Sequence, residues 1–208
     1  SGNSISLNEI MITLHYPRDF CSLAEYRALY GYLLEAAQNS GKQIFFEVDE
    51  AVKKDYYRRN KVEQAVDRAI TENRFEVYYQ PVYSTRERRF ITVEALSRLH
   101  HPELGWIAPD VFIQIAEKNH MIEQITDMQF RRICRFLKEN RELMSHLLNV
   151  KVNLSSLDLM RNDCSSHFIR MMDEYEILHD WIQFEITETV ATEYSASLGM
   201  VVDELTAA

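Results

Sequence analysis

The chain has 208 residues with a net charge of −9, of which 46% are hydrophobic and 26% charged. This composition is typical of a soluble globular protein with one large domain or two smaller ones. The negative charge argues against non-specific binding to DNA or RNA polymers, which requires a basic surface. We find no apolar run of transmembrane length and no signal peptide. A cytoplasmic location is therefore expected, with any membrane anchor of a longer parent lying outside these residues.

The three cysteines lie at positions 21, 134 and 164, a spacing that does not suit a metal site. We predict reduced, buried or partly buried thiols, as in most proteins of a reducing compartment.

The first part of the chain, residues 9–48, is predicted to form a strand, a helix and a second strand. The strands are the apolar runs Ile10–Leu14 and Ile44–Val48. Between them, Ser22 and Glu25 have the spacing of a capping box, and Gly41 is a suitable helix stop. These elements are too few for an independent domain and are interpreted as the end of one.

Residues 50–73 are charged, lack glycine and proline, and are predicted to form a connecting helix. After Phe75 the predicted elements alternate. Strands are expected at 75–79, 90–99, 150–154 and 182–186, and helices from Pro109, at 122–138, at 166–175 and at 193–206. The 32-residue spacing from Asn153 to Glu185 suits one βαβ unit, so the fold is predicted to be α/β with a parallel sheet or (β/α) barrel.

Three of these strand-like segments, residues 91–96, 150–155 and 182–188, carry a polar ligand on an apolar run. The ligands are Glu94, Asn153 and Glu185. An oxygen of this kind is costly to bury unless a cation or a hydrogen-bond donor meets it. Three in one register predict a shared site for Mg²⁺ or Mn²⁺. The alternative is a set of polar residues hydrogen-bonded at strand ends. Tyr78 and Tyr79 are predicted to serve packing and not base stacking.

Several ordered motifs from about Phe75 to the end of the chain resemble the EAL-domain family. They are Tyr79-Gln80-Pro81-Val82, Glu94-Ala95-Leu96, Arg98, His100-His101-Pro102-Glu103 with Gly105 and Pro109, Val152-Asn153-Leu154-Ser155 and Phe184-Glu185-Ile186-Thr187-Glu188. The resemblance implies a cyclic di-GMP phosphodiesterase on a modified TIM barrel, a family in which some members only bind the nucleotide. Less specifically, Ile10 to Val48 resembles the closing half of a GGDEF domain.

The resemblance also implies a domain plan. Residues 4–49 would be the C-terminal part of a GGDEF-like domain, 50–73 the connecting helix, and 74–208 the N-terminal half of an EAL-like, truncated (β/α) barrel. The predicted units are about half of those in a complete barrel.

Site roles follow from the same motifs. Glu94, Asn153 and Glu185 match the family's metal ligands, which would hold Mg²⁺ or Mn²⁺. Arg98 matches an arginine that contacts a phosphate of cyclic di-GMP, although a structural bridge to Glu94 or another carboxylate is an alternative. Gln80 matches a substrate-contacting glutamine or, without the resemblance, caps a strand. Glu188 matches a glutamate that holds a neighbouring loop.

The sequence departs from the family pattern in two places. Ser97 and Leu99 replace the usual leucine and tryptophan beside Arg98. The family's later paired aspartates, lysine, general-base glutamate and late glutamine are also missing. The resemblance implies that the parent hydrolyses cyclic di-GMP to linear pGpG. Because these later residues are missing, we expect this fragment to have little or no activity. The competing hypothesis is a non-catalytic module that binds cyclic di-GMP or another protein. The last strand, Ile182–Ile186, is expected to promote self-association through an exposed sheet edge.

Overall fold

A computed structural model describes residues 11–40 and 45–186 of the chain. Its contacts divide the chain into two compact units, residues 1–62 and 63–208. The division falls within helix α2 (Glu50–Thr71), which matches the helix predicted at 50–73. Within the described ranges, every helix is too short or too polar to pass through a bilayer.

In the first unit, the described residues before α2 form two short strands and one long helix. Strand β1 (Met11–Thr13) pairs in parallel with β2 (Phe45–Glu47), and α1 (Leu23–Ser40) connects them. Leu29 and Leu33 of α1 are buried against Val48. This arrangement confirms the predicted strand, helix and strand, although Gly41 lies outside the described residues.

The start of α1 shows part of the predicted capping box. The Ser22 hydroxyl accepts a hydrogen bond from the backbone N–H of Glu25 at 3.1 Å. The Glu25 carboxylate reaches back to the N–H of Cys21 at 2.6 Å, one residue before the one expected. Both side chains therefore satisfy backbone donors at the beginning of the helix.

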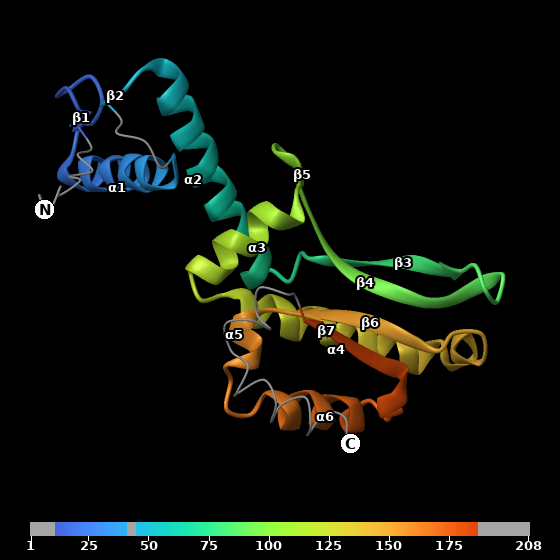
Figure 1. Ribbon diagram of the computed structural model, residues 1–208. Coiled ribbons are helices and arrows are strands. Elements are labelled where there is room, and N and C mark those ends of the chain that lie inside the picture. Colours follow the sequence, from blue (N-terminus) through green and yellow to red (C-terminus); the bar gives the residue numbers. More distant parts are fainter. Residues whose placement is uncertain (1–10, 41–44, 187–208) are drawn as a thin grey trace, which may run out of the picture. The chain divides into compact units, whose positions relative to one another are not determined.

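The second unit is built on a mixed sheet whose described strands follow the order β3-β4-β6-β7 (Figure 1). Strand β3 is antiparallel to β4. Strand β4 pairs in parallel with β6, and β6 pairs in parallel with β7. The sheet is not closed within the described residues. The strands are β3 (Glu76–Ser84), β4 (Arg89–His101), β6 (Asn149–Leu154), β7 (Ile182–Ile186) and a short β5 (Gly105–Ile107) that forms a hairpin with β4.

Helices connect the parallel strands. Between β4 and β6 lie α3 (Pro109–Lys118), α4 (Ile122–Glu139) and the 3-10 turn η1 (Arg141–Ser145). Between β6 and β7 lie α5 (Ser156–Leu159), α6 (Cys164–Glu174) and the 3-10 turn η2 (His179–Trp181). The two crossovers confirm the α/β class predicted from the alternating pattern.

Helices α4 and α6 cover one face of this sheet, which we call the helix face (Figure 1). The strands contribute Ala95, Val150 and Val152, all fully or almost fully buried. Phe130 of α4 and Phe168 of α6 pack edge-on with ring centroids 4.9 Å apart. Apolar residues at helical spacing thus meet the alternate residues of the strands, and their burial stabilises the unit.

The main departures from the predicted elements lie at their ends. Strand β3 was expected to stop at Tyr79 but continues through Pro81 to Ser84. Among the described strands β3 pairs only with β4, and an edge strand tolerates a proline because one side needs no N–H donor. The short β5 and α5 were not predicted. The helix expected at 193–206 lies outside the described residues.

Candidate functional site

The pairing of the strands determines which side chains share the second face of the sheet. Gln80 lies opposite Glu94, Glu94 is aligned with Lys151, and Asn153 is aligned with Glu185. Side chains of aligned residues point to the same face, and residues two apart in one strand do so too. Gln80, Glu94, Lys151, Asn153 and Glu185 therefore share one face. We call it the ligand face, because it carries the three predicted metal ligands.

Two of the predicted ligands are in direct contact. The amide nitrogen Nδ2 of Asn153 donates a hydrogen bond to Oε1 of Glu94 at 2.8 Å. Asn153 is exposed and Glu94 is half-buried, so the pair is open to solvent on this face. Residues 59 positions apart in sequence are thus joined at neighbouring strands, as a shared site requires.

Lys151 is a charged member of the ligand face that the sequence analysis did not identify. Its ammonium donates to Oε1 of Glu185 in a half-buried ion pair. Lys151 precedes Asn153 by two residues, and strand alternation therefore places both on this face. One predicted metal ligand is already neutralised by a positive charge from the chain itself.

Arg98 and Gln80 also lie on the ligand face, since Arg98 follows Glu94 by four residues in β4. Arg98 is half-buried and donates from Nη1 to the Ser97 carbonyl at 3.0 Å. Among the described residues, no carboxylate forms an ion pair with Arg98, so the alternative of a structural bridge finds no support there. Gln80 is exposed, and its strand continues past it, so it does not cap β3.

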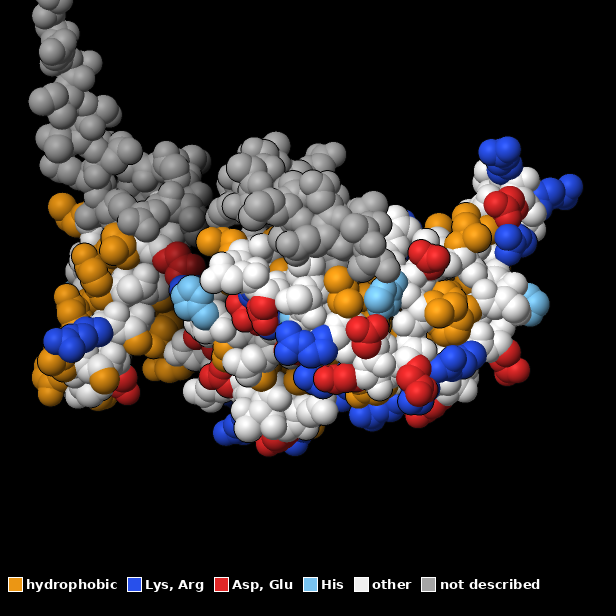
Figure 2. All heavy atoms as spheres, turned by 90° about the horizontal axis from the view of Figure 1, so that it is seen from below, with side chains coloured by type: hydrophobic (Ala, Val, Ile, Leu, Met, Phe, Trp, Pro, Cys, Tyr) orange, Lys and Arg blue, Asp and Glu red, His pale blue; other side chains and the backbone are white. Residues whose placement is uncertain are grey.

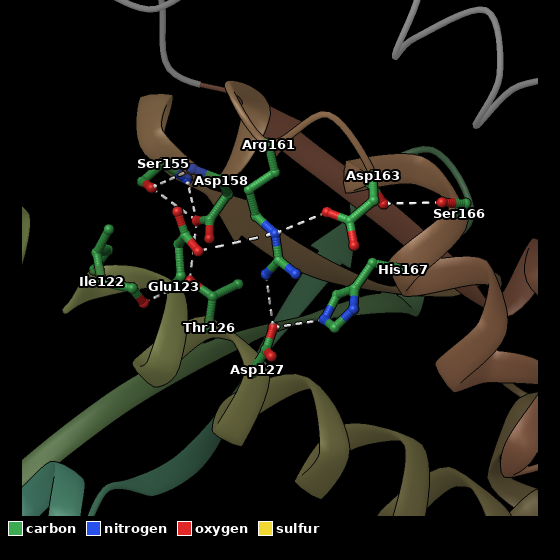
Figure 3. A network of polar contacts seen from close by, with 10 residues as sticks. All are labelled: Ile122, Glu123, Thr126, Asp127, Ser155, Asp158, Arg161, Asp163, Ser166 and His167. Carbon is green, nitrogen blue, oxygen red and sulfur yellow. Dashed lines mark hydrogen bonds and ion pairs between the residues drawn. The ribbon is translucent and has the colours of Figure 1, made fainter. Parts of the chain in front are cut away.

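The backbone that follows Asn153 is held by a buried polar network (Figure 3). Asp158 is fully buried, and its Oδ2 accepts hydrogen bonds from Ser155 N, Ser155 Oγ and Thr126 Oγ1 at 2.7 to 3.0 Å. Ser155 and Asp158 form a capping box that begins α5. Because Thr126 belongs to α4, the network joins the end of β6 to the helix layer.

A second set of contacts continues this network, with Arg161 at its centre (Figure 3). Arg161 Nη1 lies 3.3 Å from Asp127 Oδ1, and Arg161 Nε lies 3.4 Å from Asp163 Oδ1. His167 of α6 contacts the same Asp127 oxygen at 2.8 Å. The nearby carboxylates raise the pKa of Arg161 against the opposing effect of burial. The loop between β6 and α6 is therefore fixed to α4 by charge as well as by packing.

A cavity of about 420 Å³ opens beside Arg98 and Asn153, between β4, α3 and α4. Among its lining residues, Ser97 has a buried hydroxyl with no hydrogen-bond partner in the described structure, and Glu117 has a pKa raised by burial and by the charge of Asp158. Ser97 stands where the resemblance leads one to expect leucine. The smaller side chain leaves apolar space and one polar atom next to the predicted site.

The described residues contain no group of three His, Cys, Asp or Glu side chains placed to hold a metal ion. The predicted set is of a different kind, because one of its members is the amide of Asn153. Glu188 lies outside the described residues. The structure thus brings Glu94 and Asn153 together and places Glu185 on the same face, in contact with Lys151.

Comparison with known proteins decides the family. The model of the EAL domain matches residues 63–208, well over half of the chain. The chain belongs to the EAL-domain family. The solved structure of the PaMucR phosphodiesterase in complex with c-di-GMP is similar, with a TM-score of 0.65 and 26% identity over 70% of this chain and 59% of that one. The FimX EAL domain of Pseudomonas aeruginosa bound to c-di-GMP has a TM-score of 0.60 at 22% identity, covering 70% of this chain and 58% of that one, which supports the fold.

Curated relatives of this EAL chain are much longer proteins. The biofilm architecture maintenance protein MbaA of Vibrio cholerae is 27% identical over 157 residues, which are 76% of this chain and 20% of MbaA. The cyclic di-GMP phosphodiesterase NbdA of Pseudomonas aeruginosa is 30% identical over 127 residues, 61% of this chain and 16% of NbdA. The chain spans about one fifth of the length of MbaA and less of NbdA.

Proposed function

We propose that this chain is part of a signalling protein that acts on cyclic di-GMP. In the parent, the reaction is the addition of water across one P–O bond of the cyclic dinucleotide, which yields linear pGpG. The observation that carries the proposal is the ligand face, where the register aligns Asn153 with Glu185 and a hydrogen bond joins Asn153 to Glu94. The EAL family and the nucleotide named for its relatives support the choice of substrate.

Glu94, Asn153 and Glu185 are proposed to hold Mg²⁺ or Mn²⁺. Two carboxylates and one amide are the oxygen donors that these ions prefer. Asn153 uses Nδ2 for Glu94, so its Oδ1 is the atom left for a cation. When bound, the ion supplies charge stabilisation to the phosphate and lowers the pKa of a water molecule. Arg98 is proposed to bind a phosphate, Gln80 the substrate, and Glu188 a neighbouring loop.

The architecture proposed for the whole is a GGDEF–EAL protein. Residues 74–208 would be the first half of a modified TIM barrel, because β4, β6 and β7 are parallel and their crossover helices α4 and α6 lie on one face. Residues 4–49 would be a GGDEF-like remnant and 50–73 the connecting helix. We further propose a cytoplasmic location and self-association through β7, which is an edge of the described sheet.

The 208-residue chain is itself proposed to hydrolyse the nucleotide very slowly or not at all. Its sequence contains no two adjacent aspartates, which the family pattern requires after Glu188. Loss of part of a cooperating catalytic set costs most of the rate.

A non-catalytic, nucleotide-binding role is the second candidate. It is favoured by the ion pair between Lys151 and Glu185, since an ammonium then occupies one carboxylate of the metal set. The two functions differ in what the divalent ion does. In the first, the ion strengthens nucleotide binding, whereas in the second the affinity is the same with and without it.

Calorimetric titration of the purified chain with cyclic di-GMP tests both candidates. We expect binding in Mg²⁺ or Mn²⁺ that weakens in EDTA, and that weakens equally in the Glu94→Ala variant. Gln183→Ala, which changes an exposed residue of the same face, is the matched control. An affinity for cyclic di-GMP that is unchanged by EDTA and by Glu94→Ala would support the non-catalytic role. Absence of binding in every condition would contradict the proposal. Chromatography of the nucleotide after incubation measures hydrolysis, for which turnover like that of an intact EAL domain would contradict the slow rate.

A further inference from the structure

Three aromatic side chains form an exposed cluster on the ligand face. The rings of Tyr78 and Trp106 meet edge-on with centroids 5.9 Å apart, and those of His100 and Trp106 do so at 5.0 Å. Trp106 is 57% exposed and Tyr78 is 47% exposed. Packing was predicted for both Tyr78 and Tyr79, and each ring does pack against another aromatic ring, but on different faces of the sheet. Tyr79 stacks on Phe136 on the helix face, and alternation turns Tyr78 to the other side.

The register places this cluster beside Arg98. Tyr78 lies opposite Leu96 and Trp106 lies opposite His100, so the two pairs bracket Arg98 in β4. Leu96, Arg98 and His100 alternate in one strand and share a face. The rings of Tyr78 and Trp106 therefore meet at the level of Arg98, on the face that also carries Glu94, four residues earlier in β4.

Burial does not account for these rings. A large apolar side chain gains free energy when it leaves water, and Trp106 keeps more than half of its surface in solvent. An exposed aromatic surface next to a cation is what a nucleotide needs, because the phosphate meets the cation and the base stacks on the ring.

We propose that Trp106, with Tyr78 and His100 at its edges, forms a stacking surface for one guanine base of cyclic di-GMP, while Arg98 takes the adjoining phosphate. This inference rests on the proposed function and adds to it the residues that recognise a base. A purine is favoured over a protein partner because Arg98 and the three rings lie on the face that carries the proposed metal ligands.

The tryptophan fluorescence of the chain offers a direct test. The chain has two tryptophans, and Trp181 packs against the helix-face core next to the start of β7, away from the cluster. In the Trp181→Phe variant, Trp106 is the only tryptophan, so excitation of indole alone reports on it. We expect its emission to fall on titration with cyclic di-GMP, because a stacked guanine quenches indole, and to remain unchanged with an equal concentration of inorganic phosphate.

Affinity measurements on variants complete the test. Trp106→Ala should weaken cyclic di-GMP binding by roughly tenfold, as expected for loss of one stacked base, and Trp106→Phe should restore most of it. The matched control is Phe90→Ala. Phe90 forms a similar exposed edge-on pair with Tyr83, centroids 5.4 Å apart, at the opposite end of the β3–β4 hairpin. The turn at this end of the hairpin, residues 85–88, carries Arg86 and Arg88, and Figure 2 shows basic side chains at the right of the molecule.

The outcomes separate this inference from the proposed function. If the chain binds cyclic di-GMP while Trp106→Ala binds equally well and Trp106 emission is constant, the inference fails and the function stands. If Trp106→Ala instead abolishes a dimer seen by light scattering, the surface belongs to a protein partner and the inference is overturned. If the unaltered chain does not bind cyclic di-GMP, the function and the inference fail together.

Discussion

The two faces of the sheet in the second unit carry different kinds of side chain. On the helix face, Val150, Val152 and Ala95 are buried under α4 and α6, and their identity follows from packing. On the ligand face, the same strands present Lys151, Asn153 and Glu94, which are half-buried or exposed. These residues form an ion pair and an amide–carboxylate contact on an open face, where we propose that a charged ligand binds. Substitutions on the two faces should therefore change different quantities.

The largest effect on stability is expected on the helix face. Phe168→Ala removes a fully buried ring that contacts Phe130 and Phe184. It should lower the free energy of unfolding of the second unit by about 3–5 kcal/mol, measured by urea denaturation. Gln183→Ala, on an exposed position of the ligand face, should change it by no more than about 0.5 kcal/mol. Similar losses in the two variants would remove the distinction between the faces.

A smaller loss is expected where the helix layer holds the end of β6. Asp158→Ala removes the acceptor of Ser155 N and Ser155 Oγ, and it leaves Thr126 Oγ1 with only the Ile122 carbonyl. Unfolding should become easier by about 1–3 kcal/mol. Because Asn153 lies two residues before Ser155, Mn²⁺ affinity should fall as well. Asp163→Ala, at an exposed position of the same loop, is the control, and an Asp158→Ala variant that loses stability yet binds Mn²⁺ as before would contradict the link to Asn153.

A further prediction concerns Lys151 of the ligand face and its effect on Mn²⁺ affinity. Its ammonium competes with a divalent ion for Glu185, so Lys151→Ala should raise the affinity for Mn²⁺ by on the order of tenfold. Electron paramagnetic resonance of free Mn²⁺ measures this without any enzymatic assay. Lys138→Ala, which breaks a surface ion pair with Glu176, should leave the affinity unchanged. Weaker Mn²⁺ binding after Lys151→Ala would show that the lysine supports the site.

The smallest effect concerns the thiols, which report on the helix face. Burial raises the pKa of Cys134 to about 12 and of Cys164 to about 11, whereas Cys21 is exposed. Both folded values exceed that of an unfolded thiol. Their contribution to stability is therefore fully present below about pH 8.5 and is lost as the pH rises towards the folded values. At pH 8.5 a thiol reagent should label one cysteine quickly and the other two only in urea. Rapid labelling of all three would contradict burial, and Cys21→Ser should abolish the fast phase.

Much of the fold could be predicted from the sequence because strand and helix periodicity report burial directly. The strands at 150–154 and 182–186 were predicted almost to the residue, since both are short runs rich in apolar residues. The end of β3 was missed because Pro81 is a strand breaker only where both sides of a strand are paired. Short β5 is too brief for a periodic signal, although the Ser155 to Asp158 spacing before α5 was a readable capping box.

The candidate site was predicted less completely. Glu94, Asn153 and Glu185 could be selected as oxygen ligands from their residue types, but their proximity depends on register, which only pairing reveals. Lys151 could have been found, because it alternates with Asn153 and must share its face. Trp106 could not have been found in this way, because its position beside Arg98 depends on the hairpin between β4 and β5, which the sequence did not predict.

The most direct test of the account is the position of a Mn²⁺ ion in crystals of the chain, located by anomalous scattering. The account predicts one peak at about 2.1–2.2 Å from oxygens of Glu94, Asn153 and Glu185, with the Lys151 ammonium displaced from Glu185. A peak held by other carboxylates, or no peak at these three residues at saturating Mn²⁺, would contradict it.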